Sequence, residues 1–212
     1  MGVLSRREIQ KRMRLPINDD AGLVITPILD PNTAFDSDSV DLRLGSHFLL
    51  PKSQQPVFCP DESSATALHD PVHVPYGEYL VVPAHETVLG STLEFIKLPY
   101  DVSGEILTKS SVARTFILIE TAPWIHPLYR GCLTLEIANV SNTPVLLYPG
   151  RLIGQLVLLQ VAAADNASRP DVTYFGPTRP EAPIFKSPVT ELHALGISSV
   201  SVFERKRMPK GR

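Results

Sequence analysis

The sequence predicts a mainly β protein, an all-β barrel or sandwich with one short helix near its start. Proline accounts for 20 of the 212 residues, about twice its usual share of about 5%, and this density argues against long helices because proline breaks interior helical hydrogen bonds. Short runs rich in Val, Ile, Leu and Thr recur between turn residues, as they do in sheet proteins. With 43% hydrophobic and 20% charged residues, the chain can bury a core in one domain with appendages.

The first residues predict a short helix that begins after Ser5. The Ser5 hydroxyl can accept a hydrogen bond at the helix start, and Glu8 falls at the third helical position, where a capping partner is expected. The helix should run to about Arg14, because Pro16 ends it.

The runs after this helix predict the strands of a sheet protein. They cover residues 23–28, 40–50, 79–82, 87–96, 104–107, 116–119, 132–138, 145–147 and 151–161. Apolar and polar residues alternate within 132–138, so Thr134 and Glu136 should share one face. Residues 51–77 contain five prolines among polar residues and predict a long loop. We therefore expect a β domain over residues 1–162 and a partly irregular extension over 163–212.

Charge and composition exclude several classes of partner. A net charge of −2 gives no global attraction to nucleic acid or anionic membranes, and no apolar run approaches the ~20 residues that span a bilayer. Cys59 and Cys132 are interpreted as reduced thiols of a cytoplasmic protein. No spacing of Cys and His typical of zinc sites occurs, and the pair His69 and His73 has no third ligand nearby. We expect neither zinc nor a protein-bound metal cluster.

Residues 109–114, Lys-Ser-Ser-Val-Ala-Arg, place two cations and two hydroxyls directly after a predicted strand. Hydroxyls, backbone amides and cations are the groups that bind phosphate oxygens. A solvated turn would have the same composition, so this segment alone leaves both interpretations open.

The segment 124–131 predicts a tight turn that leads into the strand carrying Glu136. Tyr129 in this turn can stack on a sugar or base, or simply pack on the protein surface. A glutamate in an apolar strand must face solvent, pair with a cation, or lie in a functional pocket with a raised pKa.

Four blocks in one order make the sequence similar to a known family. They are Ser-Val-Asp-Leu-Arg-Leu-Gly (39–45), Lys-Ser-Ser-Val-Ala-Arg (109–114), the run 125–139 from Ile-His-Pro to Ile-Ala-Asn, and Pro-Gly-Arg-Leu-Ile-Gly-Gln-Leu (149–156). The helix 4–12 and residues 86–99 add to the likeness. Over about residues 3–161 the chain resembles the dCTP deaminase branch of the dUTPase-like superfamily.

This resemblance implies a distorted β-barrel or jelly roll that assembles as a homotrimer. It implies deamination of deoxycytidine triphosphate to deoxyuridine triphosphate without zinc, with Mg²⁺ accompanying the triphosphate. Implied catalytic residues are Glu136 as the proton carrier, Ser110 and the Ala122 carbonyl as holders of the attacking water, and Arg114 as an organising cation. Implied nucleotide-binding residues are Lys109, Ser111, Tyr129, Trp124, His126 and Gln155, whereas Asp41 and Arg43 are expected to support the trimer interface.

The chain also departs from the family pattern. His126 stands where the superfamily has the aspartate that activates water in dUTPases, which argues against pyrophosphate hydrolysis. Pro123 and Trp124 stand where histidine and arginine are common, and Phe116 stands near an expected glycine. The tail around Tyr174 lacks the usual Lys-Tyr-Gln pattern, although the extension 163–212 remains a candidate active-site lid. Two alternatives stay open: a dUTPase-like pyrophosphatase, and a regulatory homologue that binds nucleotides with little or no turnover.

Overall fold

The computed structural model of the chain describes residues 2–52, 68–120, 122–162 and 176–183. It divides into two compact units, one of Met1–Pro51 with Asp70–Glu181 and one of Lys52–His69 with Ala182–Arg212. The basic end, residues 205–212, lies outside the described residues, as do Cys59 and Tyr174. All elements discussed below belong to the first unit, except that strand β5 begins at His69 of the second.

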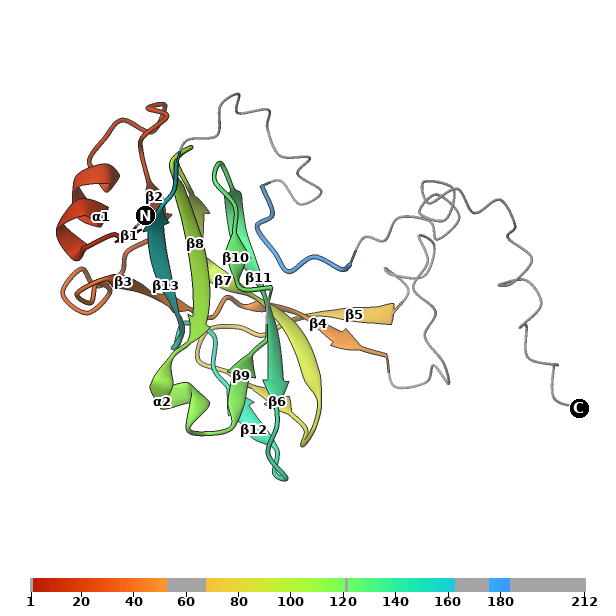
Figure 1. Cartoon of the computed structure of the whole chain (residues 1–212). Coiled ribbons are helices and arrows are strands. Elements are labelled where there is room, and N and C mark those ends of the chain that lie inside the picture. The colour runs from red at the N-terminus through yellow and green to blue at the C-terminus, as the bar shows by residue number, and fades with distance from the viewer. Residues whose placement is uncertain (1, 53–67, 121, 163–175, 184–212) are drawn as a thin grey trace, which may run out of the picture. The chain divides into compact units, whose positions relative to one another are not determined.

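Strands dominate the described residues, with two short helices among them (Figure 1). The helices are α1 (Arg6–Met13) and α2 (Ser110–Ala113). The strands are β1 (Gly2–Val3), β2 (Val24–Thr26), β3 (Ser39–Arg43), β4 (His47–Pro51), β5 (His69–His73), β6 (Leu80–Val82), β7 (Thr87–Lys97), β8 (Val102–Thr108), β9 (Ile117–Ile119), β10 (Trp124–Ile125), β11 (Arg130–Asn139), β12 (Val145–Leu147) and β13 (Leu152–Gln160).

The strands form two main antiparallel sheets and one small one. The first sheet has the order β1-β13-β8-β10, with β3 also paired to β13. The second has the order β5-β4-β7-β11-β9, with β2 also paired to β7, and β6 pairs with β12 alone. The sheets do not close into a continuous barrel, because no described strand pairing joins the first sheet to the second. The predicted mainly β jelly roll with a short N-terminal helix is confirmed in this open, distorted form.

Alternating apolar residues on the two sheets form the core. On β13, Leu156 and Leu158 are fully buried, and on β11 Leu135 and Ile137 are fully buried. The residues that alternate with these on β11 are less buried: Thr134 is half-buried and Glu136 is exposed. The predicted alternation is therefore confirmed. Each fully buried Leu or Ile contributes about 1.5–3 kcal/mol relative to exposure, which fixes the register that sets the face of Glu136.

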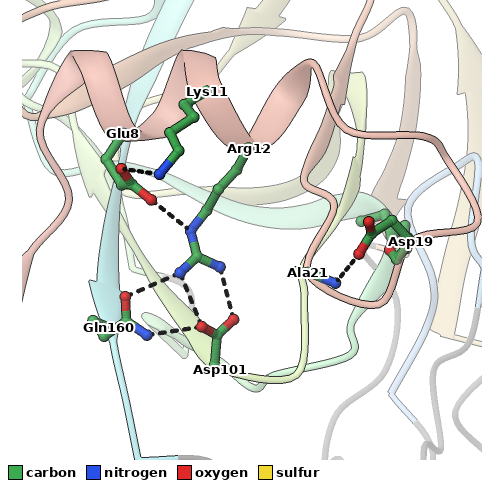
Figure 2. Close-up of polar contacts among 8 residues, drawn as sticks. Glu8, Lys11, Arg12, Asp19, Ala21, Asp101 and Gln160 are labelled. Atoms are coloured by element: carbon green, nitrogen blue, oxygen red, sulfur yellow. Dashed lines mark hydrogen bonds and ion pairs between the residues drawn. The ribbon is translucent and has the colours of Figure 1, made fainter.

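Helix α1 begins where the sequence predicted. The Ser5 side chain accepts a hydrogen bond from the Glu8 backbone amide at 3.4 Å, and Arg14 is the C-cap. Arg12 reaches from this helix to two later segments, as Figure 2 shows: its guanidinium donates to both oxygens of Asp101 at 2.8 and 2.9 Å and to Gln160 Oε1 at 3.0 Å. The guanidinium holds the pKa of Asp101 below its usual value, so the pair is ionised and fastens α1 to the sheet.

The strand predictions were correct in place for all nine runs, with three differences. The run 40–50 is two strands, β3 and β4, separated by Leu44–Ser46. The two-residue strands β1 and β10 were not predicted, because two residues are too few to show a period. The end of the predicted loop 51–77 contains β5, whose Pro71 is tolerated because β5 is an edge strand; residues 53–67 of that loop lie outside the described residues.

Candidate active site

The segment 109–114 folds into the single turn of α2 directly after β8. Lys109 is the N-cap with extended backbone angles, and its amide donates to the Ile153 carbonyl at 3.0 Å. Arg114 is the C-cap, and its amide donates to the Ser110 carbonyl at 3.2 Å. Ser110, Ser111 and Arg114 are all exposed, so the predicted hydroxyls and cation stand at the surface on one short turn.

Lys109 makes an ion pair within its own chain. Its Nζ donates to Asp41 Oδ2 at 2.5 Å, and the Asp41 side chain is 8% exposed. Asp41 Oδ1 is buried and has no hydrogen-bond partner among the described residues. Asp41, Gln155 and Leu107 are in register across β3, β13 and β8, so Asp41 and Gln155 lie on the sheet face beside the start of α2.

Glu136 lies on the exposed face of β11, between two neighbouring strands. Leu89 of β7 is its register partner on one side. On the other side, the Glu120 amide donates to the Glu136 carbonyl at 2.8 Å, one position beyond the pair Ile119 and Ile137 of the β9–β11 ladder. Burial raises the pKa of the Glu136 carboxyl, and the charge of Glu120 raises it further.

Short contacts connect the Glu136 region to α2. The Ile119 amide, next to Glu120, donates to Thr108 Oγ1 at 2.7 Å, and Thr108 directly precedes Lys109. Ala122, whose carbonyl is the predicted acceptor for the water, is exposed two residues after Glu120, and the neighbouring Pro123 carbonyl accepts from the Ile106 amide at 3.0 Å. The predicted water-binding residues Ser110, on α2, and Ala122, after β9, thus lie on segments that these contacts connect to β11, the strand of Glu136.

The turn 126–129 has the predicted proline geometry. The Tyr129 amide donates to the His126 carbonyl at 3.3 Å, with Pro127 second and Leu128 third at a φ of 66°, the pattern of a type II turn. The Tyr129 hydroxyl donates to the Cys132 carbonyl at 2.8 Å, and its ring packs against the core. Burial raises the pKa of Tyr129. This turn presents His126 to solvent, and Trp124, just before it, is 44% exposed.

Residues 176–181 lie along the free part of the β11 edge. The Gly176 amide donates to the Arg130 carbonyl at 2.8 Å, and the Cys132 amide donates to the Pro177 carbonyl at 2.7 Å. The Glu181 amide then donates to Thr134 Oγ1 at 3.2 Å. Because Thr134 and Glu136 share a face, this segment passes from the strand edge onto the face that carries Glu136.

Glu94 on β7 is a buried carboxyl, like Asp41, and the sequence did not predict its burial. It is 2% exposed, and its Oε2 accepts from the Arg43 amide at 2.8 Å. Burial raises the pKa of Glu94 to about 7. Cys132, whose thiol is free and buried, has a raised pKa because of burial and the nearby Glu94 charge.

The described residues contain neither a cluster of metal ligands nor a helix that could span a membrane. No three His, Cys, Asp or Glu side chains are grouped so that they could hold a metal ion within residues 2–52, 68–120, 122–162 and 176–183. In the same ranges no helix is long and apolar enough to cross a membrane.

Comparison with known proteins identifies the family. The dCTP deaminase-like family profile matches residues 3–161. This chain belongs to the dCTP deaminase-like family. It is 34% identical over 163 residues to the "dCTP deaminase, dUMP-forming" of Dictyoglomus thermophilum, covering 76% of this chain and 81% of the relative. It is 33% identical over 190 residues to the protein of the same name from Methanothermobacter thermautotrophicus, covering 85% and 92%.

A third relative is named without the words "dUMP-forming". The "dCTP deaminase" of Natronomonas pharaonis is 33% identical over 189 residues, with 85% of this chain and 93% of the relative covered. Among solved structures, the 2'-deoxycytidine 5'-triphosphate deaminase of Agrobacterium tumefaciens matches with a TM-score of 0.57 at 21% identity, over 92% of this chain and 54% of that one. This structural likeness supports the fold assignment.

The predicted site residues fall into three groups in the described chain. Glu136 is bonded to Glu120, and Ala122 follows Glu120 by two residues. Lys109, Ser110, Ser111 and Arg114 form the α2 turn, and Gln155 is in register with Leu107 just before that turn. Trp124, His126 and Tyr129 belong to the turn before β11. Sequence reasoning missed Glu120, because its position opposite Glu136 depends on a strand register that the sequence alone does not reveal.

Proposed function

We propose that this protein removes ammonia from dCTP to give dUTP, by zinc-free attack of water at C4 of the cytosine. The observation that carries the proposal is the Glu136 carboxyl, exposed on β11 with a raised pKa, in a chain matched to the dCTP deaminase-like family over residues 3–161. The names of the relatives from three organisms support the same substrate.

The proposed roles follow from the proton balance of the reaction. Water loses a proton as it attacks C4, N3 gains one, and the amino group leaves as ammonia, so one carboxyl that accepts and returns protons can serve every step. We assign this role to Glu136. Ser110 and the Ala122 carbonyl would orient the water, and Arg114 would steady charge around the tetrahedral intermediate.

The remaining predicted residues would bind the nucleotide. Lys109 and Ser111 would face the phosphates, Tyr129 would pack on the deoxyribose, and Trp124, His126 and Gln155 would line the nucleotide site. In the structure Lys109 is paired with Asp41 and the Tyr129 hydroxyl with Cys132. Nucleotide binding would therefore have to share or displace the Lys109–Asp41 contact. The Tyr129 ring could pack on the deoxyribose while its hydroxyl stays bonded to the Cys132 carbonyl.

Magnesium would enter the site on the triphosphate. The described residues provide no cluster of three His, Cys, Asp or Glu ligands, and Mg²⁺ commonly binds through substrate phosphates together with one or two carboxylates and several waters. Bound in this way, the ion would neutralise phosphate charge, while the chain's own residues perform the proton transfers.

A homotrimer in the cytoplasm is part of the proposal. Val3, Leu107 and Trp124 lie on one face of the first sheet according to the strand register and are 50%, 43% and 44% exposed. A second copy of the chain could cover such apolar side chains. Light scattering on the purified protein should give three times the mass of one chain; a monomer would contradict this part.

The segment 163–212 is proposed to cover the site. Residues 176–181 lead onto the Glu136 face through the Glu181–Thr134 contact, and this path supports the extension as a lid over an active site of the trimer. A variant that lacks residues 204–212 tests whether the basic end takes part: an unchanged dCTP affinity would exclude that end from the lid.

The decisive experiment incubates the purified protein with dCTP and Mg²⁺ and follows ammonia and nucleotide products by chromatography. We expect dUTP and ammonia in equal amounts. Glu136→Gln should abolish turnover while Glu78→Gln, an exposed carboxylate removed elsewhere, should not. Absence of deamination with dCTP, dCMP and dCDP would overturn the proposal.

A second candidate product is dUMP, because two of the relatives are named dUMP-forming. That product requires pyrophosphate hydrolysis as well, and imidazole can act as the base, so His126 is the residue to test. If dUMP and pyrophosphate form and His126→Ala yields dUTP instead, His126 performs this step. Formation of dUTP alone would support the simple deaminase.

A regulatory homologue is the third candidate, favoured by the departures at Pro123 and Trp124. Calorimetry with dCTP and dTTP separates it from both enzymes. Binding without any turnover would establish it.

A further inference from the structure

Glu120 and Glu136 face one another across two antiparallel strands. The β9–β11 ladder pairs Ile117 with Asn139, Leu118 with Ala138 and Ile119 with Ile137. The next position pairs Glu120 with Glu136, and the 2.8 Å hydrogen bond from the Glu120 amide to the Glu136 carbonyl continues the ladder to this point.

Directly opposed residues of an antiparallel pair project to the same face, with Cβ atoms about 4.5–5.5 Å apart. Both glutamates are exposed residues, so the two carboxylates lie on the same open face. Like charges placed in this way lower the stability of a sheet. Packing does not require such a pair, and a neutral residue would complete the ladder equally well.

The other side of Glu136 is apolar. Leu89 is its register partner on β7, and Leu49 of β4 is in register with Leu89. One row along β11, Thr134 is half-buried and in register with Ser91 of β7, and neither of these titrates near neutral pH. Glu181 is the charged residue bound to that row, through its amide and Thr134 Oγ1 at 3.2 Å, and the charge of Glu120 raises the pKa of Glu136.

We propose that Glu120 is a positioning residue of the site: its charge, which the strand register places opposite Glu136, favours the protonated form of the Glu136 carboxyl and so makes Glu136 a stronger base. This inference rests on the proposed function of Glu136. A solvated glutamate has a pKa of about 4.3 and is a weak base at pH 7. An apolar neighbour on one side and a like charge on the other are the two conditions that raise a carboxyl pKa.

The sign of the effect is set by charge. Loss of the Glu120 charge removes a repulsion that disfavours ionised Glu136, so the Glu136 carboxyl should ionise at lower pH in Glu120→Gln. In a reaction that begins with proton uptake by ionised Glu136, the acidic limb of the pH profile of kcat/KM reports this ionisation. The limb should therefore move to lower pH in the variant.

The test compares the wild type, Glu120→Gln and the control Glu78→Gln, which removes the same charge from an exposed position between β5 and β6. The first measurement is a ¹³C NMR titration of the glutamate side chains, with the Glu136 resonance assigned from Glu136→Gln. The midpoint for Glu136 should fall in Glu120→Gln and stay constant in Glu78→Gln. This measurement needs no turnover, so it remains decisive if the protein is not a deaminase.

The second measurement is the pH profile of dCTP deamination. The acidic limb should move to lower pH in Glu120→Gln, and kcat at pH 7 should fall several-fold, because a carboxylate with a lower pKa is a weaker base. Urea unfolding of Glu120→Gln should be unchanged or shifted to higher urea, because a like-charge pair is removed. The proposal would be overturned if the Glu136 titration midpoint did not move in Glu120→Gln. It would also be overturned if this variant lost stability and the acidic limb of its pH profile stayed in place.

Discussion

Lys109 Nζ and Asp41 Oδ2 form an ion pair that joins the start of helix α2 to strand β3, 68 residues earlier in the chain. Asp41 is 8% exposed and Lys109 25% exposed at the side chain, so the carboxylate has little contact with water. The pair fixes the first residue of the segment that carries Ser110, Ser111 and Arg114. The position of α2 thus depends on a charge contributed by another strand.

Removing the cation alone should destabilise the protein. Lys109→Met leaves a mostly buried carboxylate without its partner, and we expect the free energy of unfolding in urea to fall by about 2 kcal/mol, between the values for surface and buried pairs. Lys11→Met is the matched control, because its ion pair with Glu8 is largely exposed, and should change stability by less than about 0.5 kcal/mol. The double variant Lys109→Met/Asp41→Asn should recover part of the loss; strict additivity would contradict a direct interaction.

The free energy of unfolding should fall as the pH rises, because the buried Glu94 carboxyl must ionise. Its pKa is raised to about 7 in the folded protein, against about 4.3 in the unfolded chain, so the folded state binds the proton more tightly. The stabilising contribution is complete below about pH 4.3 and disappears as the pH rises through about 7. From the linkage relation this amounts to about 4 kcal/mol.

Unfolding by urea at pH 5, 6, 7 and 8 measures the Glu94 effect. The free energy of unfolding of Glu94→Gln should fall less between pH 5 and 8 than that of the wild type, whereas Glu78→Gln should follow the wild type. Parallel pH curves for Glu94→Gln and the wild type would show that Glu94 does not titrate in this range.

Gly131 should be essential for the docking of residues 176–181. Its φ is 145°, and a Cβ there would come within 2.4 Å of Pro177 Cδ, so Gly131→Ala should release the segment from β11. Hydrogen exchange should then accelerate at the Cys132 amide, which donates to the Pro177 carbonyl. Adding Pro177→Gly removes the clashing ring and should restore part of the protection, whereas Gly2→Ala, with no atom near its Cβ, should leave it unchanged.

Phe116 is held in a conformation that L residues avoid. Its φ is 63° and its side chain is 60% exposed, so burial of the side chain does not offset the backbone strain. A left-handed backbone costs roughly 1–2 kcal/mol for a residue with a Cβ, and glycine regains most of it. Phe116→Gly and Phe116→Asn should raise the thermal unfolding midpoint, corresponding to about 0.5–1 kcal/mol; Phe116→Ala keeps the Cβ and serves as the control that should not.

Local signals in the sequence predicted much of this fold. Ser5, Glu8 and Pro16 predicted the extent of α1 because capping and helix termination depend on neighbouring residues. Strand β11 was predictable because apolar residues alternate on a half-buried strand. The turn at Pro127 was also local. The glycine that the family resemblance places near Phe116 coincides with the positive φ of Phe116.

Contacts between distant segments could not be predicted in the same way. The pairing of Lys109 with Asp41 and the placement of Glu120 opposite Glu136 depend on strand order and register. The burial of Glu94 depends on which face of β7 meets the core at the irregular Cys132–Thr134 step of β11. The sequence could name Glu136 as a candidate, but its chemical surroundings exist only after β7, β9 and β11 have assembled.

The pairing of β1 with β13 has a consequence for the order of folding. Gly2 and Val3 pair with Gln160 and Leu159, and Arg12 is bound to Gln160 and Asp101. Such contacts span most of the domain, and chains rich in them fold slowly. On the ribosome the first sheet therefore stays incomplete until residue 160 has emerged, and α1, which can meet Asp101 earlier, gains its contact with Gln160 only then.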